Sequence, residues 1–263
     1  MGTAGNFGGI RVTPLKRSDA LDAVASAIAA PKVDPLLITF LNPDYACRAF
    51  IDPALRERIN AFDLVLTDGV GVQLIAPLFG FRIPERLTTD SLVPQLLAQC
   101  STADKSVFLF GSAPRVAEDA AASLMTHFPT LRVVGTHHGY DDVLAGHPGF
   151  IAESDSARIV ELVNRARPDL LLVGLPTPLQ QRWLTDMRQR LNVSAALTVG
   201  SYFNHVAEAG ASSLSWYPHW IDALRRNWAY RLFRDPDRLW RRYTLQGLDY
   251  ARLLLAARWA QRG

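Results

Sequence analysis

The stretch DLVLTDGVGVQLIA, residues 63–76, decides the fold class of this chain. Its apolar run, Leu64–Thr67, predicts a short strand buried on both faces, because polar residues do not alternate within it. A carboxylate, Asp68, and two glycines, Gly69 and Gly71, follow at once, and a helical apolar pattern begins there. A buried strand that ends in an acid and glycines before a helix is typical of the ligand-binding edge of a parallel α/β sheet.

The same alternation of strand and helix extends through the body of the chain. Further continuous apolar runs predict strands at 36–41, 106–110, 132–135, 170–174 and 195–199. Helical patterns separate them at 46–60, 71–78, 90–100, 115–127, 156–167 and 179–191, and 140–154 is predicted to be a loop. We therefore predict a Rossmann-like α/β fold, in which a mostly parallel sheet carries helices on both faces.

Composition bounds the class of protein. The chain has 263 residues, of which 49% are hydrophobic and 20% charged, so it is neither disordered nor too small for a large core. Its apolar runs are far shorter than the ~18 residues of a membrane-spanning helix. The first 14 residues lack the apolar centre of a signal peptide and predict a short flexible tail, so we expect a cytoplasmic protein. Cys47 and Cys100 lack metal-site spacing and are predicted to be free thiols.

Charge is distributed unevenly along the chain. Residues 218–263 contain ten arginines and four aspartates but no lysine or glutamate, a net charge of +6, whereas the rest carries −3. Four of the six tryptophans also lie there: Trp220, Trp228, Trp240 and Trp259. Arginine with tryptophan suits an anionic surface backed by an apolar layer, which is phospholipid, nucleic acid or both. We predict an α/β body over 1–217 and a basic, aromatic, helical appendage over 218–263.

Polar residues and glycines follow four of the predicted strands. They are Asn42, Asp68, Gly111 and Gly174. Because ligands of such sheets sit outside the carboxyl ends of the strands, these residues mark the predicted site. Spacing alone does not name the ligand, since the dinucleotide fingerprint and the Gly-Lys-Ser/Thr phosphate loop are both missing. A His-His and Asp-Asp group at 137–142 rests only on proximity, and we expect no metal.

Seven segments in a fixed order carry a resemblance to a known family. They are TFLNPDY (39–45), LVLTDGVGV (64–72), ERLTTDSLVPQLL (85–97), VFLFGSAPRVAEDAA (107–121), HHGYDD (137–142), RPDLLLVGLPTPLQQRW (167–183) and YRLFRDPDRLWRRY (230–243). Together they resemble the WecG/TagA/CpsF family, glycosyltransferase family 26, from about residue 10 to residue 243.

The resemblance implies an inverting, metal-independent glycosyltransferase with no cofactor. The family moves a hexosyl or N-acetylhexosaminyl group from a UDP-sugar to a lipid-diphosphate-linked saccharide, during synthesis of surface or exopolysaccharides. The resemblance also implies a protein on the cytoplasmic face of the plasma membrane. The expected partner of 218–263 is therefore an anionic membrane rather than nucleic acid. The protein could also form a homo-oligomer. Two alternatives are a non-catalytic binder of nucleotide-sugar or lipid diphosphate, and a nicotinamide enzyme, which the missing fingerprint disfavours.

Within this resemblance, Asp68 is the expected general base that takes the proton of the acceptor hydroxyl. The alternative is a carboxylate that only caps the following helix. Asn42 and Thr39 are expected to bind sugar hydroxyls or to orient Asp68, although Asn42 alternatively only caps or turns the chain. Arg86 and Asp90 are expected to hold donor or acceptor, and Asp90 is alternatively a helix N-cap.

The remaining expected substrate-binding residues lie along the predicted edge and in the tail. They are Gly69, Gly111, Tyr140, Gly174, Gln180, Gln181, Arg231, Arg238 and Arg241. The three arginines match the family's tail arginines, and guanidinium groups suit the oxygens of a diphosphate leaving group. Without a metal, such cations are expected to balance its charge; the alternative is a solvated or lipid-facing basic surface.

The chain departs from the family pattern at several positions. Pro176 replaces a usual glycine, Gln181 a usual glutamate and Asn204 a usual aspartate, and 211–217 replaces an expected Arg-Ala-Pro run. The loss of carboxylates removes acceptor-only groups from the expected nucleotide-sugar pocket. These departures bear on the donor and on activity rather than on the fold.

Overall fold

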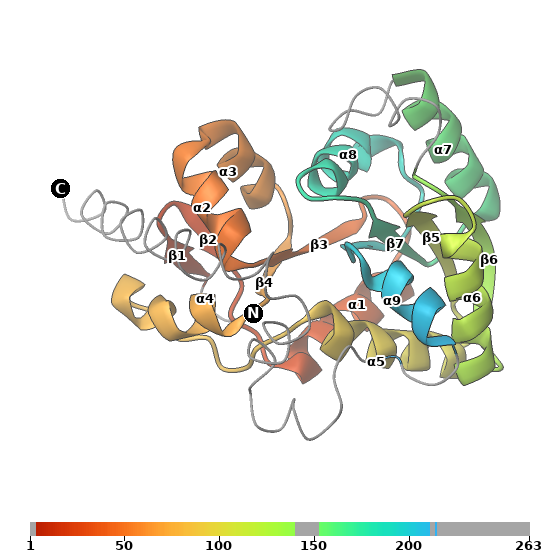
Figure 1. Ribbon diagram of the computed structural model, residues 1–263, viewed down its shortest axis with the longest axis horizontal. Helices are drawn as coiled ribbons and strands as arrows, with labels where there is room; N and C mark the ends of the chain where they lie inside the picture. Colours follow the sequence, from red (N-terminus) through yellow and green to blue (C-terminus); the bar gives the residue numbers. More distant parts are fainter. Residues whose placement is uncertain (1–3, 140–152, 211–213, 215–263) are drawn as a thin grey trace.

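A computed structural model describes residues 4–139, 153–210 and 214 (Figure 1). Its centre is a parallel six-stranded sheet in the order β4-β3-β8-β7-β5-β6. The strands are β3 (Leu36–Leu41), β4 (Leu64–Thr67), β5 (Ser106–Gly111), β6 (Arg132–His137), β7 (Leu170–Gly174) and β8 (Ala195–Thr198). All six lie where the apolar runs predict them, and three have the predicted bounds. The Rossmann-like prediction is confirmed.

Helices cover both faces of this sheet, as predicted. The α-helices are α1 (Arg17–Ala29), α2 (Pro43–Ile51), α3 (Pro53–Asn60), α4 (Val70–Ile75), α5 (Thr89–Thr102), α6 (Val116–His127), α7 (Glu153–Ala166), α8 (Leu179–Met187) and α9 (Tyr202–Ala209). Short 3₁₀ turns, η1 (Ala76–Phe79) and η2 (Arg188–Arg190), extend α4 and α8. The first face carries α2, α3, α4, α7 and α8, and the second carries α1, α5, α6 and α9.

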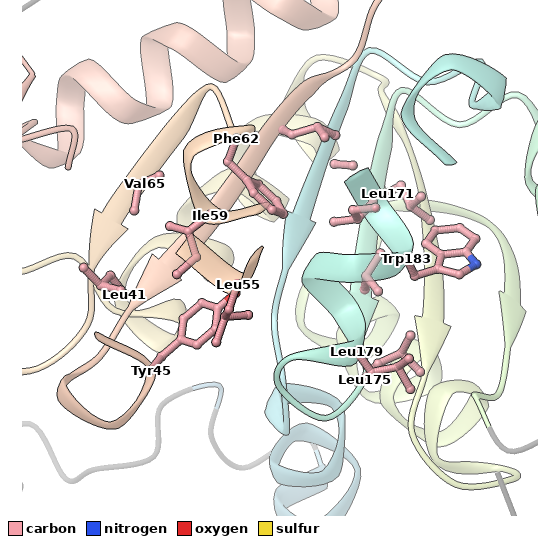
Figure 2. Close-up of a cluster of buried hydrophobic side chains, with 14 of the residues drawn as sticks. Leu41, Tyr45, Leu55, Ile59, Phe62, Val65, Leu171, Leu175, Leu179 and Trp183 are labelled. Atoms are coloured by element: carbon pink, nitrogen blue, oxygen red, sulfur yellow. The ribbon is translucent and has the colours of Figure 1, made fainter. Parts of the chain in front are cut away.

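Alternating side chains of β3, β4, β5, β7 and β8 divide between two hydrophobic clusters. On β3, Leu37 and Leu41 enter the first cluster, whereas Ile38 and Phe40 enter the second. Figure 2 shows the first cluster, with Leu41, Tyr45 and Leu55 on one side and Leu171, Leu179 and Trp183 on the other. Burial on both faces explains why these strands read as uninterrupted apolar runs.

Three local predictions need correction. The helix predicted over 46–60 is two helices, because Asp52 accepts a hydrogen bond from Leu55 N and Pro53 starts α3 as its first residue. The predicted flexible N-terminal tail contains an antiparallel hairpin, β1 (Gly5–Phe7) and β2 (Ile10–Val12). Phe7, Ile10 and Val12 are fully buried in the first cluster, which fixes the hairpin on the body. Helices α1 and α9 are additional to the predicted set.

Two carboxylates hold the amino ends of the strands, opposite the predicted site. Asp63 accepts a hydrogen bond from Leu37 N at 2.7 Å, and Asp169 accepts one from Ser106 N at 2.9 Å. Lys32 Nζ lies 3.1 Å from Asp169, and Arg188 contacts Asp63 in the same way. This edge of the sheet is therefore structural. The predicted appendage, 218–263, lies outside the described residues.

Candidate active site

The carboxyl ends of β3 and β4 bring Asn42 and Asp68 to adjacent positions. Leu41 and Thr67 are the last paired residues of these strands, and the N–H of Asp68 donates to Leu41 O at 2.9 Å. Both side chains are half-buried. A carboxylate and an amide therefore stand side by side at the edge where the sheet predicts a ligand.

The two glycines after Asp68 are explained by Pro43. A Cβ on Gly71 would lie 3.0 Å from Pro43 Cγ, and one on Gly69 would lie 3.4 Å from Pro43 Cδ. Gly69 also has φ +105°, a conformation that favours glycine. The turn after β4 thus packs against the start of α2, which keeps Asp68 beside Asn42.

Asn42 and Asp68 differ in their position relative to the helices that follow them. Gly69, not Asp68, occupies the N-cap position of α4. Asn42 is the N-cap of α2, and its Oδ1 accepts from Tyr45 N at 2.9 Å. The capping interpretation of Asn42 is confirmed. Its Nδ2 and the second lone pair of Oδ1 are the positions from which Asn42 could contact a ligand.

Three buried polar side chains lie where β3 and β8 separate. Ile38 and Leu197 form the last paired position of the two strands, and the next residues, Thr39 and Thr198, join through their hydroxyls at 3.0 Å. Gln181 Nε2, from α8, donates to Thr39 Oγ1 at 3.2 Å. Thr39 is fully buried, so this network holds the edge from below rather than lining its surface.

The second polar group lies at the carboxyl ends of β5 and β7. A Cβ on Gly111 would lie 2.4 Å from Gly174 O, and Gly111 has φ +128°. Only glycine permits this approach, which lets Ser112 N donate to Gly174 O at 2.8 Å. Gly139 N donates to Ser112 O, so the turn after β6 joins the same group.

The loops after β5 and β7 pass to opposite faces of the sheet. Helix α6 follows β5 and packs in the second cluster, whereas α8 follows β7 and packs in the first. Such a divergence between neighbouring parallel strands is where doubly wound sheets bind nucleotides. Gly111 and Gly174 therefore stand at a topological switch point of this sheet.

Gln180 connects the loops that follow β7 and β8. Its Oε1 accepts from Gly200 N at 3.0 Å, and its Nε2 donates to Thr177 Oγ1 at 3.2 Å. It is 5% exposed and Gln181 is 1% exposed. Both amides, predicted to bind substrate, are mostly engaged within the protein; Gln181 Oε1 is buried without a hydrogen-bond partner.

Arg86 and Asp90 are half-buried before and within the first turn of α5. The N-cap of α5 is Thr88, which forms a capping box with Ser91, so the N-cap interpretation of Asp90 is wrong. Asp90 instead lies close enough to Tyr202, at the start of α9, for its charge to add to the effect of burial, which raises the pKa of that phenol.

The structure leaves several predicted residues untested. Tyr140, Arg231, Arg238 and Arg241 lie outside the described residues.

Within 4–139, 153–210 and 214, there is no group of three His, Cys, Asp or Glu side chains able to hold a metal. No helix in the same part of the chain is long and apolar enough to cross a membrane. Cys47 and Cys100 form no disulfide, and burial raises the pKa of Cys100 to about 12, which disfavours its reactive thiolate form.

Sequence reasoning did not include Ser112 or Thr198 among the site residues. Each lies at the carboxyl end of a strand: Ser112 follows Gly111, the last residue of β5, and Thr198 is the last residue of β8. Their position at the end of a predicted strand was the sequence feature that could have identified both as site residues.

Comparison with known proteins agrees with this geometry. A family model, "Glycosyl transferase WecG/TagA/CpsF family", matches residues 6–263. An N-acetylglucosaminyldiphosphoundecaprenol N-acetyl-beta-D-mannosaminyltransferase of Bacillus subtilis (strain 168) is 23% identical over 206 residues, which cover 78% of this chain and 74% of that protein. The protein of the same name from Staphylococcus aureus (strain MW2) is 24% identical over 221 residues, covering 84% and 81% of the two chains.

Proposed function

Because the chain belongs to the WecG/TagA/CpsF family of glycosyl transferases, we propose that it transfers a sugar from a UDP-sugar to a lipid-diphosphate-linked saccharide, with inversion. The adjacency of Asp68 and Asn42 at the carboxyl edge of a parallel sheet carries this proposal. The names of the two relatives support an N-acetylhexosaminyl group as the transferred sugar and a diphosphoundecaprenol-linked sugar as the acceptor.

Asp68 is the proposed general base. Its carboxylate takes the proton of the acceptor hydroxyl while that oxygen bonds to the anomeric carbon of the donor. The bond from the anomeric carbon to the diphosphate breaks, and its electron pair stays on the diphosphate oxygen. Half-burial leaves the carboxylate reachable, and the close packing of Gly69 and Gly71 on Pro43 fixes its position.

We place the nucleotide part of the donor at the β5 and β7 ends. The glycines there let backbone groups approach a ligand closely, and the divergence of the two loops suits a nucleotide. The acceptor would then approach from the β3 and β4 side, where Asp68 lies. Arg231, Arg238 and Arg241 are proposed to balance the charge that develops on the leaving diphosphate.

The lipid-linked acceptor places the reaction at a membrane surface, on the cytoplasmic side where nucleotide-sugars are found. We propose that 218–263, with its net charge of +6, binds anionic lipid there. Peripheral binding of this kind needs no spanning helix.

A direct transfer assay tests this function. Purified full-length chain is mixed with a short-chain prenyl-diphosphate-linked N-acetylglucosamine and one of several UDP-sugars, with UDP-N-acetylmannosamine first. We expect release of UDP, a product heavier by one sugar, and an inverted anomeric configuration by NMR. Nucleotide-sugar binding without transfer to the acceptor in the presence of anionic vesicles would favour the non-catalytic binder instead.

A further inference from the structure

Ser112 holds an unfavourable backbone conformation directly after β5. Its φ is +62° and its side chain is 5% exposed. A residue with a Cβ adopts this left-handed region at a cost that glycine avoids. The contacts of the hydroxyl must therefore explain why a serine occupies this position.

The hydroxyl of Ser112 donates to Asn204 Oδ1 at 3.0 Å. The other acceptor in reach, Gly174 O, is 3.5 Å away and is the weaker partner. A hydroxyl has one hydrogen to donate, so it fixes the orientation of the Asn204 amide with the oxygen toward Ser112. Nδ2 of Asn204 then faces away from Ser112.

Asn204 lies in the first turn of α9, at the same edge as the two strand-end glycines. The preceding residue, Phe203, occupies the space that a Cβ on Gly174 would need. Asn204 is half-buried, and within the described part of the chain no group accepts a hydrogen bond from its Nδ2. An oriented, partly exposed N–H₂ group is a hydrogen-bond donor offered to a ligand.

We propose that Asn204 is a specificity-determining residue, whose Nδ2 donates a hydrogen bond to an acceptor atom of the nucleotide, and that Ser112 is the positioning residue that orients it. The inference rests on the proposed function. An ionised aspartate, which the family resemblance gives as usual at this place, only accepts hydrogen bonds and would repel the same atom. The Ser112–Asn204 pair thus changes which nucleotide atom is recognised here.

The acceptor is either a carbonyl oxygen of the base or an oxygen of the diphosphate. Both are hydrogen-bond acceptors, and both are disfavoured by a carboxylate. Uridine carries only the first and inorganic pyrophosphate only the second, so these two probes distinguish the sources.

Calorimetric binding of UDP to the full-length chain tests the proposal. Replacing Ser112 with Gly removes the hydroxyl and also relieves the backbone, so we expect an unchanged or higher Tm together with UDP binding weaker by about 5- to 30-fold. Asn204→Ala is expected to weaken binding by a similar factor, and Asn204→Asp by more. The double variant Ser112→Gly/Asn204→Ala should bind like Asn204→Ala alone, because Ser112 acts through Asn204.

Asp104→Gly is the matched control. Asp104 also has a positive φ, +52°, but precedes β5 at the opposite end of the strand. The Tm of this variant should likewise be unchanged or higher, and it should bind UDP like the wild type.

The outcomes separate this inference from the proposed function. Loss of affinity for uridine, or for pyrophosphate, in the Asn204 variants supports the inference and names the contacted group. UDP binding at wild-type strength in Ser112→Gly and Asn204→Ala, or losses that add in the double variant, overturns it and leaves the proposed function standing. A wild-type chain that binds no UDP overturns both.

Discussion

Thr198 donates a hydrogen bond from its hydroxyl to that of Thr39, one residue beyond the last paired position of β3 and β8. The backbone pairing of β3 and β8 ends before this point, and the two threonine hydroxyls continue the contact between the strands. Gln181, from α8, adds a third element to the same buried point. The two halves of the candidate site are thereby held together beneath its surface.

Replacing Thr39 with Val keeps the shape of the side chain but removes the shared acceptor. Gln181 Nε2 and the Thr198 hydroxyl would then be buried with their hydrogen bonds lost, at a cost of about 1–3 kcal/mol in the free energy of unfolding. Urea denaturation measures this cost. Thr126→Val, at an exposed position of α6, is the control and should change stability by at most about 0.5 kcal/mol. Equal effects of the two substitutions would show that the network contributes no stability.

The positions of β3, β4, β5, β7 and β8 were predictable from the sequence because these strands are buried on both faces and form uninterrupted apolar runs. The break between α2 and α3 was readable as well, since Asp52-Pro53 is an N-cap followed by a favoured first helical residue. The β1–β2 hairpin was not readable, because three-residue strands are too short to show a period. The hairpin is buried by packing against residues far away in the sequence, which a local pattern cannot show.

The site was partly predictable for a related reason. Asn42, Asp68, Gly111 and Gly174 each follow a strand, so a parallel sheet brings them to one edge. The contacts of Thr39 with Gln181 and Thr198 span 142 and 159 residues and depend on the strand order β3-β8-β7. Periodicity does not give strand order. For the same reason, Gln180 and Gln181 could not be recognised as internal contacts.

Gly111→Ala is expected to destabilise the chain more than a positive φ alone explains. The new Cβ would meet the Gly174 backbone at 2.4 Å, in addition to the strain of a left-handed conformation, for a total of roughly 3 kcal/mol or more. Gly80→Ala is the control, because Gly80 has φ +83° but nothing within 4 Å of the added Cβ, and about 1–2 kcal/mol is expected. Thermal unfolding monitored by circular dichroism compares the loss of stability in the two variants. Similar losses would mean that the backbones of β5 and β7 can move apart to accommodate the new Cβ.

Asp169 makes stability depend on pH in the acid range. Burial works to raise the pKa of its carboxyl, but hydrogen bonds from Ser106 and Lys32 outweigh burial and hold that pKa below the usual value. A carboxyl with a lowered folded pKa stabilises the protein fully above the unfolded value of about 3.9, and this stabilisation is lost as pH falls through the folded pKa.

The expected result is a pH-dependent difference between wild type and Asp169→Asn. Urea unfolding at pH 7, 5, 4 and 3 should show the variant less stable by a constant amount above about pH 4, with the difference shrinking below it. A difference that stays constant down to pH 3 would contradict the lowered pKa.

Asp68→Asn keeps the size of the side chain and removes its ability to take a proton. Transfer should fall by about 10²–10⁴-fold in kcat, the usual contribution of a positioned base, while Tm stays near that of the wild type. Asp22→Asn, on the exposed side of α1, removes one carboxylate from the surface and should leave turnover unchanged. Near-normal turnover of a folded Asp68→Asn protein would remove Asp68 from the mechanism.

The tail arginines are expected to act on the diphosphate as well as on lipid. Arg238→Ala and Arg241→Ala each remove a cation proposed to balance the leaving group, so kcat/KM for the UDP-sugar should fall even with a detergent-soluble acceptor and no bilayer. Arg262→Ala removes the same charge from the end of the appendage and should affect only binding to anionic vesicles, by roughly 1 kcal/mol at low salt. Vesicle co-sedimentation at two ionic strengths, run beside the soluble assay, separates the two effects. If Arg238→Ala and Arg241→Ala lower vesicle binding but leave the soluble reaction intact, these arginines contact lipid alone, and another group must balance the diphosphate.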